Sequence, residues 1–571
     1  MNYLENYNEW LSNPYFDEAT RKELTAIKDN DKEIKERFYK DLEFGTGGLR
    51  GILGAGINRM NIYTIRRATQ GLANYIIKQK GQDRGAVIAY DSRRMSPQFA
   101  LQTALCLTAN GIKAYLFDSL RPTPELSFAV RELGCIAGIV ITASHNPPEY
   151  NGYKVYWEDG AQITSPRDEE IICEVNKIKD FSFAKTMSGE EAVKQGLLRI
   201  IGEDIDNKYI KSLKKLVINP ITEEGKNLNI VYTPLHGSGN IPARRILNEL
   251  GFKNVYVVPE QEYPDSEFST VGYPNPEDPA VFELAKELAE KINGDIILAT
   301  DPDADRLGVQ VRDNKGDYVL FNGNMTGALI AEYVFSQRAK KGILPSNSAL
   351  IKTIVTGNLA DRIAEEYKAR IIEVLTGFKY IGEQIKLFEE TGSGEFVFGY
   401  EESYGYLVGT HSRDKDAIVA VMVLCEAAAY YKFQGISLYE QMENIYRKYG
   451  YYKEETVSVT LKGIEGMEKI KSIMEGYRRN TPKTAGGYEI LKCRDYMYDT
   501  IIDAKTGEVY PTGLPKADVL YYELNDDAWC AIRPSGTEPK IKFYFGVKGS
   551  SKEDASRRLS NLINDEVFSV L

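Results

Sequence analysis

Apolar and polar positions follow two spacings along this chain. Over residues 1–43 the apolar side chains recur every three or four positions among charged ones, which predicts a helical N-terminal extension. Further along, short apolar runs alternate with segments of helical spacing. We expect buried strands at 86–90, 113–117 and 135–141, separated by helices at 65–80 and 97–110. Alternation of this kind is typical of α/β layers.

The same alternation recurs twice more. Further strands are expected at 228–232, 255–258, 295–299, 349–355, 371–375 and 396–398. After two expected helices, at 415–433 and 437–449, the chain becomes rich in β-type segments such as 456–461, 519–524 and 541–545. The pattern therefore predicts an α/β fold of three consecutive α/β domains, with mixed sheets flanked by helices, followed by a C-terminal α+β domain.

Domain boundaries are placed where the sequence turns polar between these blocks. We expect the extension at 1–43, the first three domains at 44–205, 206–318 and 319–448, and the last at 449–571. A length of 571 residues agrees with about four domains at roughly 150 residues each.

Composition narrows the class of protein. Lys and Arg total 71 against 82 Asp and Glu, a net charge of −11, which argues against a nucleic-acid partner. The six cysteines show no CxxC spacing, and three histidines leave little scope for a histidine-ligated metal. The first residues are polar, and no apolar run approaches the roughly 18 residues of a membrane helix. We expect a cytoplasmic protein with no membrane partner.

Two loops that follow apolar runs carry distinctive chemistry. Residues 142–148 read TASHNPP, in which Ser144 could be a nucleophile or part of a polar turn. Residues 301–306 read DPDADR, and three carboxylates at alternate positions favour a hard cation such as Mg²⁺ or Ca²⁺ over a solvated acidic turn. An EF-hand is excluded, because Arg306 and Arg312 stand where that loop needs Gly and Glu.

Two later loops give weaker signals on their own. Residues 399–405 read GYEESYG, whose carboxylates and hydroxyl suit sugar hydroxyls, although an exposed charged hairpin would look similar. Residues 533–540 read RPSGTEPK, which suits a phosphate or a plain Ser-Gly turn equally well.

Taken together and in this order, the four loops resemble those of the α-D-phosphohexomutase superfamily, most closely its phosphoglucomutase branch. The resemblance runs from the GTGGLRG segment at 45–51 to about residue 545 and leaves the first forty or so residues unexplained. It implies four domains arranged around a central cleft, each contributing one loop.

The resemblance also implies roles for individual residues. Ser144 would be the phosphoserine, and Asp301, Asp303 and Asp305 would bind Mg²⁺ together with an oxygen on Ser144. The other implied catalytic residues are Arg50, Lys154, His145 and His411, with Lys154 or His411 moving the hydroxyl proton. The implied substrate-binding residues are Arg306, Thr376, Gly377, Lys379, Glu401, Ser403, Arg413, Lys415, Arg533, Ser535, Gly536 and Thr537. His236, in the TPLHG segment at 233–237, would face the cleft or be structural.

The expected function is that of an intramolecular phosphotransferase, interconverting α-D-glucose 1-phosphate and glucose 6-phosphate through phosphoserine and glucose 1,6-bisphosphate. The sugar loop carries a Tyr before its two glutamates, and Ser403 and His411 are one residue further apart than in the well-known glucose enzymes. Phosphopentomutase and phosphomannomutase therefore remain alternatives, as do a sugar-bisphosphate synthase and a non-catalytic sugar-phosphate-binding relative. We expect a small-molecule sugar phosphate as the partner and a monomer or homodimer.

Overall fold

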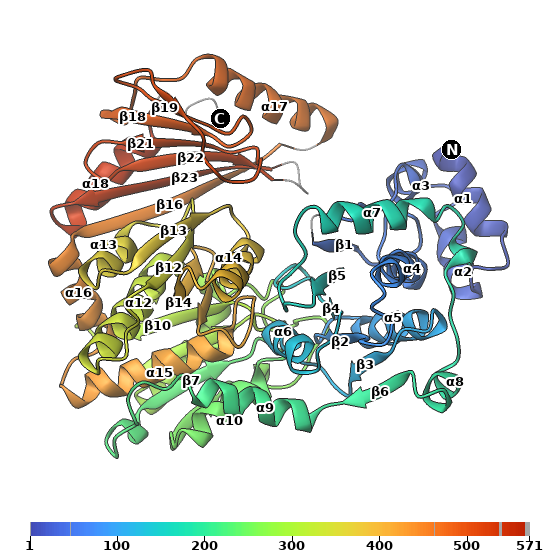
Figure 1. The fold of residues 1–571 in the computed structure, drawn as a ribbon, viewed down its shortest axis with the longest axis horizontal. Coiled ribbons are helices and arrows are strands. Elements are labelled where there is room, and N and C mark those ends of the chain that lie inside the picture. The colour runs from blue at the N-terminus through green and yellow to red at the C-terminus, as the bar shows by residue number, and fades with distance from the viewer. Residues whose placement is uncertain (1, 46, 462, 536–539, 566–571) are drawn as a thin grey trace. The chain divides into compact units, whose positions relative to one another are not determined.

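The computed structural model describes residues 2–45, 47–461, 463–535 and 540–565 (Figure 1). The chain forms two compact units. The first comprises residues 1–320, 381–392 and 403–435, and the second comprises 321–380, 393–402 and 436–571.

The first unit begins with a three-helix extension. Its helices are α1 (Tyr3–Ser12), α2 (Glu18–Ala26) and α3 (Asp31–Phe38), drawn in blue in Figure 1. Asn2 begins α1 with a capping box that uses Glu5. The apolar stripe of these helices forms a core of its own, in which Trp10 stacks on Phe16 at 4.1 Å between ring centroids. Tyr63 and Phe181, from beyond the extension, complete this aromatic core.

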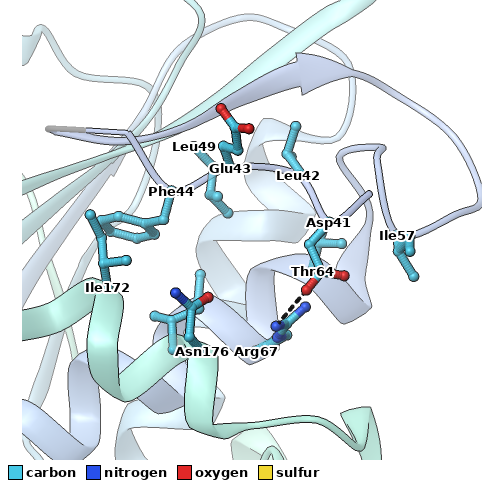
Figure 2. Close-up of a pocket in the computed structure, with 12 residues that line it drawn as sticks. Asp41, Leu42, Glu43, Phe44, Leu49, Ile57, Thr64, Arg67, Ile172 and Asn176 are labelled. Carbon is cyan, nitrogen blue, oxygen red and sulfur yellow. Dashed lines mark ion pairs between the residues drawn. The ribbon is translucent and has the colours of Figure 1, made fainter. Parts of the chain in front are cut away.

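A small cavity of about 150 Å³ lies where the extension meets the first sheet (Figure 2). It is lined by the loop that leaves α3 and by α4 and α7, and an ion pair of 2.8 Å joins Asp41 to Arg67 at its side. Leu49 lines the cavity, whereas Arg50, the next residue of the strand, is exposed. Because successive side chains of a strand alternate, the extension supports the face of this strand opposite to Arg50.

The first sheet has six strands in the order β1-β5-β4-β2-β3-β6. Strands β4, β2, β3 and β6 are parallel, and β5 is antiparallel to both β4 and β1. The strands are β1 (Gly48–Ile52), β2 (Ala86–Tyr90), β3 (Ala114–Phe117), β4 (Ala137–Ile141), β5 (Tyr150–Trp157) and β6 (Leu198–Ile201). The helices of this region are α4 (Ile62–Lys78), α5 (Ser96–Ala109), α6 (Thr123–Glu132), α7 (Arg167–Lys177), α8 (Gly189–Lys194) and α9 (Glu203–Lys214).

The second sheet has five strands in the order β11-β10-β9-β7-β8. Strands β9, β7 and β8 are parallel, and β10 is antiparallel to β9. The strands are β7 (Asn229–Thr233), β8 (Asn254–Val257), β9 (Ile296–Thr300), β10 (Leu307–Arg312) and β11 (Tyr318–Phe321). The accompanying elements are α10 (Asn240–Glu249), α11 (Glu283–Ile292), β15 (Gly405–Val408) and α15 (Ala417–Phe433). Helix α15 is buried on all sides but its end and packs against α10 and β15.

The second unit starts with a third α/β layer. Its parallel strands lie in the order β13-β12-β14. The elements are α12 (Gly323–Lys340), β12 (Ser348–Thr353), α13 (Leu359–Glu366), β13 (Arg370–Val374), α14 (Phe378–Thr391), β14 (Glu395–Glu401) and α16 (Leu438–Tyr449). Most of α14 belongs to the first unit.

An antiparallel sheet of eight strands ends the chain. Its order is β16-β23-β22-β21-β18-β19-β20, with β17 paired to β18. The strands are β16 (Tyr451–Thr460), β17 (Thr484–Ala485), β18 (Tyr488–Asp495), β19 (Thr500–Asp503), β20 (Val509–Tyr510), β21 (Leu520–Leu524), β22 (Trp529–Pro534) and β23 (Lys540–Gly549). Helices α17 (Gly463–Arg479) and α18 (Lys552–Ile563) accompany this sheet.

The predicted fold class is confirmed: three α/β layers precede a C-terminal domain with an antiparallel sheet. The domain boundaries set from the sequence stay a prediction. Within the described residues no single helix is long and apolar enough to cross a membrane, although α15 and α16 pass that test as a pair bent by 88°.

Truncation of Trp10 tests whether the extension is part of the folded core. Trp10→Ala should lower the free energy of unfolding by about 3–5 kcal/mol, because a large side chain 2% exposed leaves a cavity behind. Urea unfolding followed by circular dichroism measures the change. Glu9→Ala, an exposed position on the same helix, is the control, and equal stability of the two variants would contradict the prediction.

Candidate functional site

The serine loop leaves the carboxyl end of β4, where open α/β sheets present functional groups. Ser144 is 3% exposed and adopts a left-handed backbone with φ of 52°. That conformation is costly for a non-glycine residue and persists only where neighbours hold it. The Ser144 amide donates to Thr142 Oγ1 at 2.8 Å, and the Thr142 hydroxyl donates to Asp91 Oδ2 at 2.6 Å.

Arg93 holds the serine loop by hydrogen bonds to its backbone. Its guanidinium, 1% exposed, donates to the carbonyl oxygens of Ser144 at 2.6 Å, Pro147 at 2.8 Å and Tyr150 at 3.1 Å, and also to that of Asn146. One planar fork thus fixes four carbonyl groups of a single loop. Arg93 and Asp91 were not predicted as site residues, although they stand directly after the predicted strand at 86–90, a position comparable with that of Ser144.

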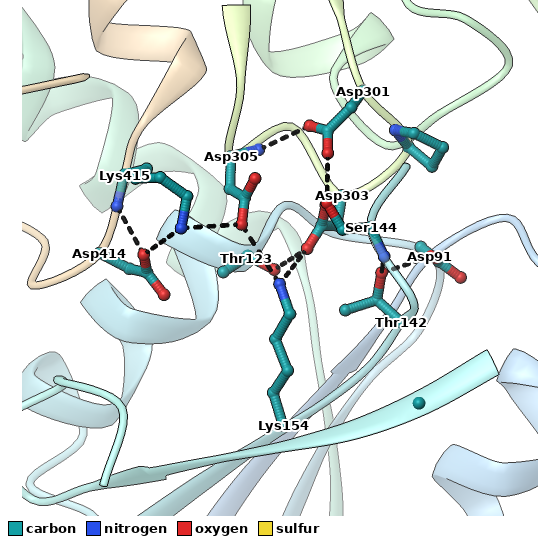
Figure 3. A network of polar contacts seen from close by, with 12 residues as sticks. Asp91, Thr123, Thr142, Ser144, Lys154, Asp301, Asp303, Asp305, Asp414 and Lys415 are labelled. Atoms are coloured by element: carbon teal, nitrogen blue, oxygen red, sulfur yellow. Dashed lines mark hydrogen bonds and ion pairs between the residues drawn. The ribbon is translucent and has the colours of Figure 1, made fainter. Parts of the chain in front are cut away.

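The aspartate loop connects β9 to β10 and lies against Ser144 (Figure 3). Asp301, Asp303 and Asp305 are at most 2% exposed, and one carboxylate oxygen from each lies within 4.8 Å of the others. The Ser144 hydroxyl donates to Asp301 Oδ2 at 2.6 Å. The structure therefore brings together the serine and the three carboxylates, whose loops are about 157 residues apart in the chain.

This carboxylate cluster fits a divalent metal ion. Asp303 Oδ1 and Asp305 Oδ1 are buried and have no hydrogen-bond partner within the part of the chain that the structure describes. Buried carboxylate oxygens are costly without a donor or a cation, and hard cations such as Mg²⁺ prefer oxygen ligands. The donor set is therefore suited to such an ion.

Two lysines reach the same carboxylates. Lys154 Nζ, from β5, lies 2.7 Å from Asp303 Oδ2 and 3.2 Å from Asp305 Oδ2. Lys415 Nζ lies 3.2 Å from Asp305 Oδ2 and 2.9 Å from Asp414 Oδ1. Lys415 was predicted to bind substrate, and the structure places it beside the aspartate loop.

The aspartates of the site differ in the direction in which their pKa values are shifted. Burial, and then the neighbouring Asp303 and Asp305, hold the pKa of Asp301 well above its ordinary value. Burial also acts to raise the pKa of Asp305, but Lys154 and Lys415 outweigh it and lower that pKa. Burial acts to lower the pKa of Lys154, and Asp303 and Asp305 raise it above its ordinary value.

Other predicted residues lie close to the serine. His145 Nδ1 is 3.1 Å from Ser144 Oγ, and burial, followed by Arg306 and Arg50, holds its pKa well below the ordinary value. Arg50, in β1, donates a hydrogen bond to Asn146 Oδ1 at 3.2 Å. Arg306 forms an ion pair with Glu277. Arg50 and Arg306 thus bring positive charge close to the serine loop.

His411 and Arg413 are held by contacts of a different kind. His411 Nε2 lies 2.6 Å from Asp416 Oδ2, and Asp416 also accepts from Tyr209 and begins α15 as its N-cap. The Arg413 side chain is fully buried and bonds to the carbonyls of 410 and 412 and to Glu389. Both side chains are held by these contacts, and their predicted roles in catalysis and substrate binding stay predictions.

Ser403 and His236 complete the predicted residues of the first unit. Ser403 precedes Tyr404, whose carbonyl accepts from the amide of Leu307 at 3.0 Å, directly after the aspartate loop. His236 bonds to the carbonyl of Tyr263 at 2.9 Å and to Thr270 Oγ1 at 2.8 Å. Both ring nitrogens of His236 are thus engaged in holding its loop, which favours the structural role.

The second unit gathers several predicted residues into two loops. Glu401 is 5% exposed and accepts from the amide of Gly377 at 2.8 Å, which joins the sugar loop to the loop carrying Thr376. Lys379 follows in the first turn of α14. Arg533 lies at the end of β22, and the amide of Ser535 donates to the carbonyl of Lys540 at 2.7 Å. The predicted phosphate-binding residues Gly536 and Thr537 lie outside the described residues.

Fold and site together define a class: an α/β protein with a buried serine bonded to a cluster of three carboxylates. Family models of the phosphoglucomutase/phosphomannomutase α/β/α domains I, II and III match residues 41–181, 207–316 and 322–449, and the model of the C-terminal domain matches 517–559. The chain belongs to this phosphoglucomutase/phosphomannomutase family of the α-D-phosphohexomutase superfamily, a family of isomerases.

Similar proteins span the whole chain. The phosphoglucomutase of Staphylococcus saprophyticus is 36% identical over 566 residues, 99% of each chain. That of Staphylococcus haemolyticus is 38% identical over 531 residues, covering 93% of this chain and 94% of the relative. Among solved structures, parafusin (phosphoglucomutase) from Paramecium has a TM-score of 0.69 at 17% identity, covering 93% of this chain and 95% of its own. A Burkholderia thailandensis family member has a TM-score of 0.65 at 19% identity, covering 91% and 95%. At these identities the structures support the fold.

Arg93→Lys tests whether the serine loop is positioned by the guanidinium fork. A lysine keeps the charge but cannot bond to four carbonyls in fixed geometry. We expect kcat to fall by about 10²-fold with a smaller change in KM, because a misplaced reacting group slows the chemical step. Steady-state kinetics measures both constants. Arg94→Lys, at the exposed neighbouring arginine, is the control, and equal kcat in the two variants would contradict the prediction.

Proposed function

We propose that this chain is a phosphoglucomutase, interconverting α-D-glucose 1-phosphate and glucose 6-phosphate through a phosphorylated Ser144. The observation that carries the proposal is the 2.6 Å hydrogen bond between Ser144 Oγ and a cluster of three buried carboxylates. Relatives named phosphoglucomutase, 36–38% identical over nearly the whole chain, support glucose over mannose or a pentose as the sugar.

Asp301, Asp303 and Asp305 would hold the metal ion, and the proposal takes it to be Mg²⁺. When bound, Mg²⁺ supplies Lewis acidity that draws negative charge from a phosphoryl group. Asp303 Oδ1 and Asp305 Oδ1, which accept no hydrogen bond among the described residues, support this assignment. Asp301 in addition orients the Ser144 hydroxyl by accepting its hydrogen bond.

Phosphoryl transfer asks the protein mainly to position groups and to neutralise charge. The left-handed Ser144, held through Thr142 and Arg93, presents its oxygen in one fixed direction. Arg50 and Arg306 would attract the phosphate of the substrate. Transfer from phosphoserine to the free hydroxyl of the sugar gives glucose 1,6-bisphosphate, which returns its other phosphate to Ser144 after turning over.

Lys154 is the better supported of the two predicted proton carriers. Its raised pKa keeps the ammonium protonated in the resting site, so it can donate a proton to Ser144 Oγ when the phosphoryl group leaves. The neutral lysine then takes the proton of the sugar hydroxyl that receives the phosphoryl group, and in the return step the same proton transfers run in the opposite direction. His411 is engaged by Asp416 and is less suited to this role.

The sugar loop and the C-terminal loop would bind the rest of the substrate. Glu401 and Ser403 would contact sugar hydroxyls, and Arg533 with Ser535 would bind the phosphate that does not react. The turning of the bisphosphate requires both ends of the ligand to be recognised in either orientation. We propose a cytoplasmic enzyme, monomeric or homodimeric, with sugar phosphates as its partners.

Ser144→Ala tests the nucleophile. We expect kcat to fall by on the order of 10⁶-fold with an unchanged melting temperature, because the variant lacks the oxygen that carries the phosphoryl group. The assay supplies Mg²⁺, trace glucose 1,6-bisphosphate and glucose 1-phosphate, and measures glucose 6-phosphate. Mannose 1-phosphate and ribose 1-phosphate replace the substrate in parallel reactions.

Ser182→Ala, at an exposed serine of the same unit, is the control. Wild-type turnover in Ser144→Ala would rule out the phosphoserine mechanism. Faster conversion of mannose 1-phosphate or ribose 1-phosphate would identify that sugar phosphate as the preferred substrate in place of glucose 1-phosphate. Release of free phosphate would indicate a phosphatase.

The raised pKa of Asp301 predicts that metal affinity depends on pH. A metal ion binds the deprotonated carboxylate, and lowering the pH populates the protonated form. The apparent affinity for Mg²⁺ should therefore fall as the pH is lowered from about 8 to about 5. Isothermal titration of the protein with Mg²⁺ at each pH measures this, and a constant affinity across the range would contradict the prediction.

A further inference from the structure

Thr123 is a buried residue that contacts the aspartate loop and was not predicted as a site residue. It is the first residue of α6 and is 0% exposed. Its amide donates to the carbonyl oxygen of Asp303 at 2.9 Å, and its hydroxyl donates to Asp303 Oδ2 at 2.8 Å. The first amides of a helix have no acceptor within the helix, and here the aspartate loop supplies one. Thr123 thus binds both the backbone and the side chain of one candidate metal ligand.

The segment that carries Thr123 is anchored to the first sheet. The amide of Arg121 donates to the carbonyl of Tyr90 at 3.1 Å, at the end of β2. Pro122 is the N-cap of α6, and its ring fixes its φ, here −57°. The Thr123 hydroxyl is therefore presented to the aspartate loop by backbone of fixed conformation.

The backbone of the aspartate loop is also held by a second segment. Ser238, just before α10, donates its amide and its hydroxyl to the carbonyl of Pro302 at 2.8 and 2.9 Å. A Cβ on Gly237 would lie 2.5 Å from Pro302 Cα, so this close approach requires glycine. Because these contacts and the Thr123 amide fix the backbone, loss of the Thr123 hydroxyl acts on the side chain of Asp303.

The two carboxylate oxygens of Asp303 have different surroundings (Figure 3). Oδ2 accepts from the Thr123 hydroxyl and from Lys154 Nζ, which lies 2.7 Å away. Oδ1 is buried and accepts no hydrogen bond among the residues that the structure describes. The two donors thus occupy Oδ2 and leave Oδ1 for a cation.

Asp305 shows the same division of its oxygens. Its Oδ2 lies 3.2 Å from both Lys154 Nζ and Lys415 Nζ, and its Oδ1 is buried without a hydrogen bond from the described residues. Each lysine carries its charge at the end of a flexible side chain, whereas Thr123 contributes a short neutral hydroxyl. The hydroxyl therefore fixes the orientation of the Asp303 carboxylate without adding charge to the site.

The number of oxygens that each aspartate offers bears on which cation fits the site. Ca²⁺ accepts carboxylates through one or both oxygens in flexible arrangements, whereas Mg²⁺ demands near-ideal octahedral geometry and usually keeps several waters. A carboxylate with one oxygen already engaged suits Mg²⁺ better than Ca²⁺. Groups that hydrogen-bond to metal ligands commonly change metal affinity by about 10–100-fold when they are mutated.

We propose that Thr123 is a positioning residue of the metal site. It holds Asp303 as a ligand through one oxygen, and it thereby raises the preference of the site for Mg²⁺ over Ca²⁺. This inference rests on the metal site of the proposed function, but it depends neither on the identity of the sugar nor on a phosphate at Ser144. Without the hydroxyl, Lys154 is the remaining donor to Oδ2 among the described residues, so the carboxylate can turn and offer both oxygens.

Isothermal titration of the full chain with MgCl₂ and with CaCl₂, at one fixed pH, tests the proposal. Thr123→Val keeps the shape of the side chain and removes the hydroxyl. We expect its Kd for Mg²⁺ to rise by about tenfold and its Kd for Ca²⁺ to change less, so that the preference shifts toward Ca²⁺. Thr123→Ser keeps the hydroxyl and should bind both ions as the wild type does.

Thr108→Val is the matched control. Thr108 is 1% exposed, and its hydroxyl donates to the carbonyl of Leu105 within α5 at 3.1 Å, away from the aspartate loop. This variant should keep both dissociation constants of the wild type. Melting temperatures in EDTA show whether each metal-free variant is folded, and Thr123→Ala, with the same expected shift, replaces Thr123→Val if the latter does not fold.

The outcomes separate this inference from the metal site itself. A purely structural role of Thr123 would weaken both ions equally, and that result would overturn the proposal, as would wild-type constants in Thr123→Val. A failure of Thr123→Ser to restore the wild-type preference would overturn it as well. A wild-type chain that binds neither ion would remove the metal site, and this inference with it.

Discussion

A cluster of three buried carboxylates, one of which accepts the hydrogen bond of a buried serine, sets the requirements for the first unit. Their mutual repulsion in a site shielded from water must be offset by cations, and Lys154 and Lys415 are the cations that the structure places there. A divalent ion at the two unpartnered oxygens would complete the compensation. Burial, together with the neighbouring carboxylates, raises the pKa of Asp301, and the same carboxylates raise the pKa of Lys154 against the effect of its burial.

Such a site requires that the backbone of the serine loop and of the aspartate loop be held in fixed conformations. Ser144 keeps a left-handed conformation because Arg93, Asp91 and Thr142 fix its loop, and the aspartate loop is fixed from behind by Thr123 and Ser238. The supports come from the ends of different strands, in keeping with the rule that open sheets build sites beyond their strand ends.

The sequence indicated the chemistry of this site better than its scaffold. The alternation of strands and helices predicted the layers, and the resemblance of the four loops to those of the α-D-phosphohexomutase superfamily implied that Ser144 and the three aspartates would act together. The role of Arg93 could not be predicted from the sequence, because this residue bonds to backbone carbonyls, which no side-chain motif reveals. The contacts of His411 with Asp416 were equally hidden, because they depend on how α15 packs, a long-range property that local pattern does not encode. The predicted domain boundaries and the roles of Gly536 and Thr537 stay predictions.

The proposed mechanism requires a phosphate on Ser144. Incubation of the protein with isotopically labelled glucose 1,6-bisphosphate and Mg²⁺, followed by proteolysis and mass spectrometry, locates any phosphate that the protein takes up. We expect the label on the peptide that contains Ser144, and we expect it to leave when glucose 1-phosphate is added. Label on another residue, or a protein that turns over substrate while Ser144 is never labelled, would contradict the mechanism.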